Sequence, residues 1–188
     1  MKELLVSSWK DKCKVMQRYD LTAEMYEERY SGEQKAKYLA ALEIVNVSSH
    51  IVLDVGCGTA LFFSQVDSQA DIIVGVDISH KLLLKANQQA KASGNAFILQ
   101  ADADHLPFRD NLFDDVFAFT VLQNMPNPTE TLAELKRSAK VGGKVVVTGL
   151  KKAFPLPKFM DVLEGSGLCS ASFIDRQNLN CYVAILTV

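Results

Sequence analysis

The stretch Val52-Leu53-Asp54-Val55-Gly56-Cys57-Gly58-Thr59-Ala60 decides the fold of this chain. An apolar run ends in an aspartate, and two glycines follow with one residue between them. The nearly continuous apolar run predicts a strand that is buried on both faces. The glycines predict a tight turn that lets a ligand approach the backbone closely. A helix expected over 60–69 would place free N–H groups beside this turn, where an anionic group can bind.

The chain on both sides of this stretch extends the pattern. Further apolar runs lie at 72–76, 96–99, 116–119 and 145–147, and helical stretches lie at 80–93 and 129–140. Alternation of strands and helices predicts an α/β fold with a parallel sheet. A short helix near 158–166 and two last apolar runs, at 171–174 and 182–188, predict a hairpin that joins the sheet.

The composition is typical of a globular protein that does not span a membrane. The 188 residues, of which 48% are hydrophobic and 22% charged, predict one globular domain. A net charge of -2 argues against a global electrostatic grip on nucleic acid. We expect no membrane span, because no run of 18 apolar residues occurs, and no signal peptide, because the apolar part of MKELLVSSWKDK is short. The four cysteines lack CxxC spacing, so we expect no metal site and a cytoplasmic protein with reduced thiols.

Acidic residues follow three neighbouring strands of the predicted sheet. Asp54 and Asp77 end the first two strands, and Asp102 comes directly after the third. Ligands of open α/β sheets bind at this edge, and an acid about 20 residues after the glycines is where a ribose is held. Each acid alone is also typical of a turn or a helix N-terminus. Leu61 stands where a dinucleotide fingerprint needs a third glycine, which argues against NAD or FAD.

Taken together, four segments resemble the motifs of class I S-adenosylmethionine-dependent methyltransferases. They are LDVGCGTA (53–60), GVDIS (75–79), QADADHLPF (100–108) and FDDVFAFTVLQNMPNP (113–128). The resemblance implies a Rossmann-like sheet of seven strands, mostly parallel with an antiparallel last strand, and helices on both faces. It also implies an enzyme whose cofactor is S-adenosyl-L-methionine.

The resemblance assigns roles to particular residues. Asp54, Gly56, Cys57 and Gly58 would lie at the methionine moiety of the cofactor, with the backbone of Thr120 facing its amine. Asp77 would accept both ribose hydroxyls, Ile78 would pack on the adenine, and Asp102 with the backbone of Ala103 would read the adenine edge. Ala60 stands where family members often have a further glycine.

The N-terminal segment suggests a branch of the family. Residues 1–45 are expected to form a helical lid and 46–188 the methyltransferase core, with Ser31-Gly32 breaking the segment into two helices. Tyr19, Tyr26 and Tyr30 resemble the lid tyrosines of the small-molecule, ubiquinone/menaquinone-methyltransferase-like group. We expect Tyr19 and Tyr30 to contact the cofactor, although packing of the tyrosines onto the sheet explains the same pattern.

Few residues are candidates for catalysis. Methyl transfer from a sulfonium is an in-line displacement that needs positioning and exclusion of water more than a general base. Asn124 follows the fourth strand and would orient a polar group of the substrate, or is a turn residue. His105 lies in the adenine-side loop, where a surface role is the alternative. A [DN]PP[YF] motif is absent after the fourth strand, which argues against transfer to base amines or glutamine amides.

Three functions remain open from the sequence. The first is methyl transfer to a small molecule. The second is methylation of RNA or protein with a small activator partner, docked on the apolar edge strand NAFILQ (95–100), unless a helix covers this edge. The third is a non-catalytic module that binds the cofactor.

Overall fold

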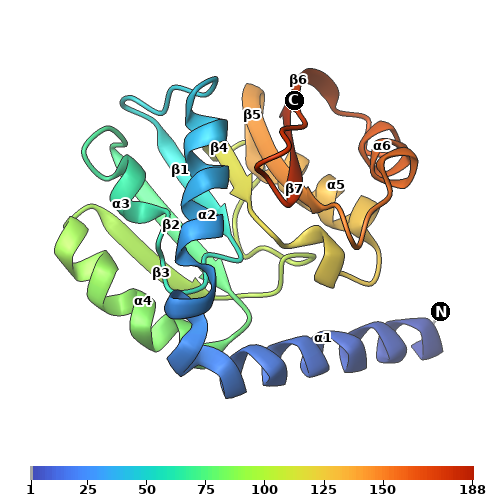
Figure 1. The fold of residues 1–188 in the computed structure, drawn as a ribbon, viewed down its shortest axis with the longest axis horizontal. Helices are drawn as coiled ribbons and strands as arrows, with labels where there is room; N and C mark the ends of the chain where they lie inside the picture. Colours follow the sequence, from blue (N-terminus) through green and yellow to red (C-terminus); the bar gives the residue numbers. More distant parts are fainter. Residues whose placement is uncertain (1) are drawn as a thin grey trace.

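A computed structural model describes residues 2–188 and shows one mixed sheet between two layers of helices (Figure 1). The strands are β1 (Ile51–Val55), β2 (Ile72–Asp77), β3 (Ala96–Gln100), β4 (Phe113–Ala118), β5 (Ala139–Leu150), β6 (Cys169–Ile174) and β7 (Cys181–Thr187). Their order is β3-β2-β1-β4-β5-β7-β6, and β7 is antiparallel to both of its neighbours while the other pairs are parallel. This confirms the Rossmann-like α/β class and the antiparallel last strand.

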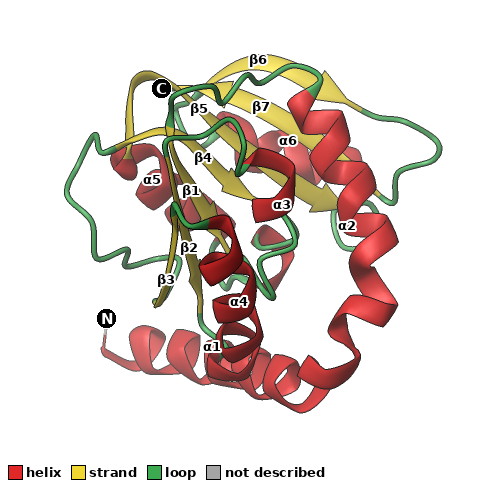
Figure 2. Cartoon of the chain, turned by 90° about the vertical axis from the view of Figure 1, so that its left-hand side faces the viewer, coloured by secondary structure: helices red, strands yellow, loops and turns green. Residues whose placement is uncertain are grey.

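The helices cover both faces of the sheet (Figure 2). They are α1 (Lys2–Thr22), α2 (Tyr26–Leu42), α3 (Phe63–Val66), α4 (His80–Ser93), α5 (Pro128–Ser138) and α6 (Leu156–Glu164), with 3-10 turns η1 (Ala23–Met25) and η2 (Leu122–Asn124). One core lies under α2, α3 and α4, and the other lies under α5 and α6. Consecutive strand residues alternate between the two, so that Val52 enters the first core and Leu53 the second. Each such buried side chain contributes about 1.5–3 kcal/mol.

Helix α4 confirms the prediction for 80–93, and its ends explain why. Ser79 caps it by accepting a hydrogen bond from the Leu82 amide at 3.2 Å, and Gly94 ends it in the left-handed region at φ 77°.

Two helix predictions are wrong. The helix expected over 60–69 shrinks to the single turn of α3, since Ala60 has a φ of 63° and cannot belong to a right-handed helix. No helix therefore begins directly after the glycine turn. The break expected at Ser31-Gly32 does not occur, because α2 runs through both residues and the chain turns at η1 instead. One glycine costs a helix only about 1 kcal/mol, and the packing of Tyr38 and Ala41 on the sheet offsets it.

The two N-terminal helices differ in position. Helix α2 packs on one face of the sheet, whereas α1 crosses below the carboxyl ends of the strands, at the bottom of Figure 1. Among residues 2–188, no helix combines the length and the apolar character that a membrane span requires.

Candidate functional site

A pocket opens at the carboxyl ends of β1 to β4, under α1. Its empty volume is about 680 Å³, including the part that is open to solvent. Loops after all four strands line it with Gly56, Ile78, 101–103 and 119–121, and α1 closes it with Lys12, Val15 and Tyr19. Its place at the carboxyl ends of parallel strands is where open α/β sheets bind ligands.

The glycine turn after β1 allows close packing at the pocket wall. Gly56 has a φ of 72°, and a Cβ there would lie 2.5 Å from Cγ2 of Val121. Gly58 has a φ of 58° and lies against the Tyr26 ring, whose hydroxyl would be 3.2 Å from a Cβ. Position 56 therefore requires glycine for the backbone conformation and for the space, whereas at position 58 the positive φ and the tight fit against Tyr26 favour glycine.

Two carboxylates lie together at this turn. Asp77 accepts hydrogen bonds from the Gly58 amide at 2.9 Å and from the Ser79 amide at 2.8 Å. Asp54 is buried behind the pocket wall. Burial and the nearby charge of Asp77 raise the pKa of Asp54, and no hydrogen bond or cation among the described residues offsets this rise. A buried carboxylate without such a partner favours a positively charged ligand.

The third carboxylate is held by α1. Lys12 Nζ lies 2.7 Å from Asp102 Oδ2 and 2.5 Å from Asp104 Oδ2, and the lysine is only 5% exposed. Burial lowers the pKa of the Lys12 ammonium, but the two carboxylates outweigh this effect and raise the pKa above its ordinary value. The lysine is thus charged and bridges α1 to the loop after β3.

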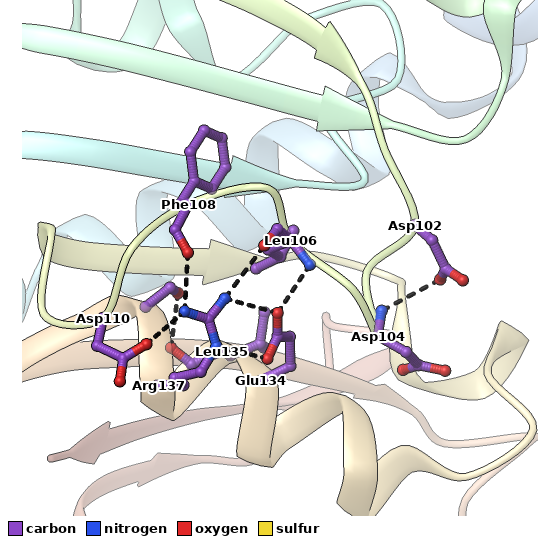
Figure 3. Close-up of polar contacts among 9 residues, drawn as sticks. Asp102, Asp104, Leu106, Phe108, Asp110, Glu134, Leu135 and Arg137 are labelled. Carbon is purple, nitrogen blue, oxygen red and sulfur yellow. Dashed lines mark hydrogen bonds and ion pairs between the residues drawn. The ribbon is translucent and has the colours of Figure 1, made fainter.

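The loop of residues 101–112 is fixed from below by α5 (Figure 3). Arg137 donates hydrogen bonds to the backbone carbonyls of Leu106 and Phe108, and pairs with Asp110 and Glu134. Glu134 in turn accepts a hydrogen bond from the Leu106 amide at 2.7 Å. These contacts hold in place the loop that carries Asp102.

Polar contacts also fasten the second half of α1. Asn124 of η2 accepts a hydrogen bond from Arg18 at 2.8 Å and donates one to the Tyr19 hydroxyl at 3.2 Å. Asp20 accepts a hydrogen bond from the Ser79 hydroxyl at 2.5 Å. Burial raises the pKa of Tyr19, so its phenol is neutral at ordinary pH. Helix α1 therefore forms a wall of the pocket, held mainly by polar groups.

The structure brings most of the expected residues to one place. Seven line the pocket: Tyr19, Gly56, Asp77, Ile78, Asp102, Ala103 and Thr120. Asp54, Cys57, Gly58 and Tyr30 do not line it: Cys57 and Gly58 belong to the glycine turn, Asp54 is buried before it, and Tyr30 packs on Tyr26 with ring centroids 5.2 Å apart and planes tilted by 55°. Of the two catalytic candidates, Asn124 lines the pocket, whereas His105 is exposed outside it.

Sequence reasoning missed several lining residues, which are Lys12, Val15, Leu82 and Met125. Tyr26, named from the sequence as resembling a lid tyrosine, lines the pocket as well. Lys12, Val15 and Tyr19 are spaced by three and four residues, which places them on one face of a helix. That spacing is the pattern that would have predicted the α1 wall.

Comparison with known proteins agrees with this geometry. The family model "Methyltransferase domain" matches residues 53–147. A demethylmenaquinone methyltransferase of Staphylococcus saprophyticus is 38% identical over 97 residues, which are 50% of this chain and 42% of that protein. The chain spans about half the length of the curated relatives it matches.

Solved structures share the fold. A SAM-dependent methyltransferase of Aquifex aeolicus has a TM-score of 0.71 and 18% identity, with 81% of this chain and 89% of that chain covered. A Haloferax volcanii methyltransferase, solved in complex with the Trm112 methyltransferase activator, has a TM-score of 0.73 and 16% identity, with 90% and 96% covered. The match of the family model shows that this chain belongs to the methyltransferase-domain family, whose cofactor is S-adenosylmethionine.

Proposed function

We propose that this protein transfers a methyl group from S-adenosylmethionine to a small-molecule acceptor. The observation that carries the proposal is the buried carboxylate of Asp54 behind a pocket that is lined by Asp77 and Asp102. A cationic ligand with a ribose and an adenine offers a partner for each carboxylate. The four free cysteines fit a cytoplasmic protein.

The residues of the chain would act by binding, orienting and excluding water. Asp77 would accept from the ribose hydroxyls, with its position fixed by the Gly58 and Ser79 amides. Val15, Tyr19 and Tyr26 would keep water from the reacting atoms, which supports an in-line displacement. When bound, the cofactor supplies the methyl group and the leaving group.

The residues that line the pocket also indicate which kind of methyl acceptor it suits. Among the described residues that line the pocket there is no histidine, and burial raises the pKa of both Tyr19 and Tyr26, so neither phenol is ionised to act as a base. An acceptor that enters with a free lone pair, or that loses its proton readily, needs no general base. Asn124 would orient its polar group at the η2 side of the pocket.

Two experiments test the proposal. Calorimetry should show binding of S-adenosylhomocysteine to the wild-type protein and at least about tenfold weaker binding to Asp77→Ala, a loss of about 1.4 kcal/mol. Incubation with methyl-labelled cofactor and an extract of the source cells should then label a product of low molecular mass. Absence of binding would contradict the cofactor assignment, and label only in RNA or protein would contradict the small-molecule acceptor.

The edge of the sheet favours a second function, methylation of RNA or protein with a small activator partner. Strand β3 pairs only with β2 in the sheet order. Helix α4 covers one face of β3, where Ala96 and Ile98 pack on the core, but Phe97 and Leu99 are 60% and 43% exposed on the other. An exposed apolar edge is a site where a partner can add a strand. The Haloferax relative of the same fold was solved with an activator.

Affinity purification from the source cells separates the two functions. A stoichiometric small partner that is lost in Phe97→Glu/Leu99→Glu supports the second function. Leu84→Glu is the matched control, because Leu84 is equally exposed but lies on α4. Recovery of the wild-type protein alone supports the first function.

A further inference from the structure

Helix α2 carries a buried lysine that points to the cofactor side of the sheet. Lys37 is 1% exposed, and its Nζ lies 2.8 Å from Glu33 Oε1 and 2.9 Å from Thr120 Oγ1. Burial of an ammonium group is costly unless its partners are well placed. The buried Lys37 side chain therefore contacts Thr120, a residue of the loop that follows β4.

That residue has an unusual backbone conformation. Thr120 has a φ of 65°, in the left-handed region, which is disfavoured for a β-branched residue. Every polar group of Thr120 is held: its amide donates to Thr148 Oγ1 at 2.7 Å, and its hydroxyl accepts from Lys37. Its carbonyl accepts from the side-chain amides of Gln123 at 2.6 Å and Asn124 at 3.0 Å. Strained backbone persists where surrounding contacts over-determine it.

The conformation of Thr120 shapes the pocket. Thr120 lines the pocket together with Gly56 and Val121. Val121 follows directly, and its Cγ2 occupies the space that only a glycine at position 56 leaves free. A change at Thr120 would therefore move Val121 and the backbone of residue 120, which is proposed to face the methionine amine.

We propose that Lys37 is a positioning residue that holds Thr120 in the left-handed conformation required for cofactor binding. The inference rests on the proposed function, since it concerns the same pocket. Lys37 does not line that pocket and acts through the Thr120 hydroxyl. Lys37 should become dispensable when glycine replaces Thr120, because glycine adopts the left-handed conformation readily.

A double substitution tests this. Affinity for S-adenosylhomocysteine is measured by calorimetry, and folding by circular dichroism, for Lys37→Met, Thr120→Gly and the combined variant. We expect Lys37→Met to bind about tenfold more weakly, equivalent to 1.4 kcal/mol, and the combined variant to bind within about threefold of wild type. A purely structural lysine would not be rescued by glycine at position 120. Lys35→Met, an exposed lysine of the same helix, is the matched control and should bind as wild type.

Other outcomes are equally decisive. Wild-type affinity in Lys37→Met, or a combined variant no better than Lys37→Met, overturns the inference alone. If Lys37→Met does not fold, Thr120→Val replaces it, because this change keeps the Lys37–Glu33 pair and removes only the hydroxyl. Weaker binding by Thr120→Val then supports the inference, and unchanged binding overturns it. A wild-type protein that does not bind at all overturns the proposed function together with the inference.

Discussion

At the scale of single residues, Asp54 shows a conflict between stability and function. Its carboxylate is buried near Asp77, and this raises its pKa. A folded-state pKa above the unfolded value means that stability is lost as pH rises through the folded pKa. The ionised carboxylate thus destabilises the free protein and becomes favourable when a cation is bound nearby.

Asp54→Asn should therefore stabilise the free protein at neutral pH and weaken cofactor binding. We expect a higher free energy of unfolding, because the asparagine side chain carries no charge that burial penalises. Urea unfolding measures the stability and calorimetry the affinity for S-adenosylmethionine. A variant that is both less stable and unimpaired in binding would contradict this assignment.

The same carboxylate predicts how binding depends on pH. A cationic ligand favours the ionised form of Asp54, so binding below the raised pKa releases a proton and affinity rises with pH until that pKa is passed. Calorimetry of S-adenosylmethionine in buffers of different ionisation enthalpy measures the proton release. S-adenosylhomocysteine lacks the sulfonium charge and serves as the control, with a smaller pH dependence. Equal proton release for both ligands would argue against the role of Asp54.

At the scale of elements, residues 8–22 of α1 are held mainly by polar contacts. Among these residues, Tyr19 packs on a cluster of Ala23, Tyr26 and Leu82. Elements with few buried apolar contacts open at low free energy. The Lys12 bridge to Asp102 and Asp104 is the most buried of the ion pairs that fasten the helix.

Replacement of Lys12 by Met should let α1 open more often. Loss of about 1.4 kcal/mol would raise hydrogen exchange of the α1 amides about tenfold. Hydrogen exchange followed by mass spectrometry measures this, with the amides of β1 as an internal reference. Lys14→Met is the matched control, because the Lys14–Asp11 pair lies on the exposed side of the same helix. Equal exchange in the two variants would show that the bridge does not hold the helix.

Sequence patterns predicted some helices and strands correctly and others wrongly. Strands β1 to β5 and helix α4 were predictable, because buried strands give continuous apolar runs and Ser79 and Gly94 mark the helix ends. The left-handed conformation of Ala60 was not, since it arises from the packing around the glycine turn. The unbroken α2 was missed because burial against the sheet outweighs the propensity of Gly32.

At the scale of the whole molecule, the sequence at the carboxyl ends of the strands predicted the site better than the sequence of the helices did. The motifs after β1 to β4 meet because parallel strands end at the same edge, so Asp77 and Asp102 were predictable from their spacing. The contribution of α1 was predictable only in part, because the spacing of Lys12, Val15 and Tyr19 indicates a shared helix face but does not indicate what that face contacts. Lys12 is paired with residues 90 and 92 positions away.

Removal of residues 1–22 should leave the fold intact and weaken cofactor binding. Both cores lie on the faces of the sheet, and neither contains any of residues 8–22. We expect the midpoint of thermal unfolding to fall by about 5 °C or less, since about 1 kcal/mol corresponds to 2–4 °C at this size. Affinity for S-adenosylhomocysteine should fall more than about tenfold. Circular dichroism and calorimetry measure the two effects, and loss of the fold would place α1 among its structural requirements.

The bridge between Lys12 and Asp102 has a kinetic consequence. Both oxygens of Asp102 contact the lysine, at 2.9 and 2.7 Å, and the same carboxylate is expected to receive the adenine amine. Helix and nucleoside would therefore meet at one carboxylate, which can accept hydrogen bonds from both. Each exchange of spent for fresh cofactor would require the helix to swing away and return, so the pace of turnover would follow this motion rather than the methyl transfer itself.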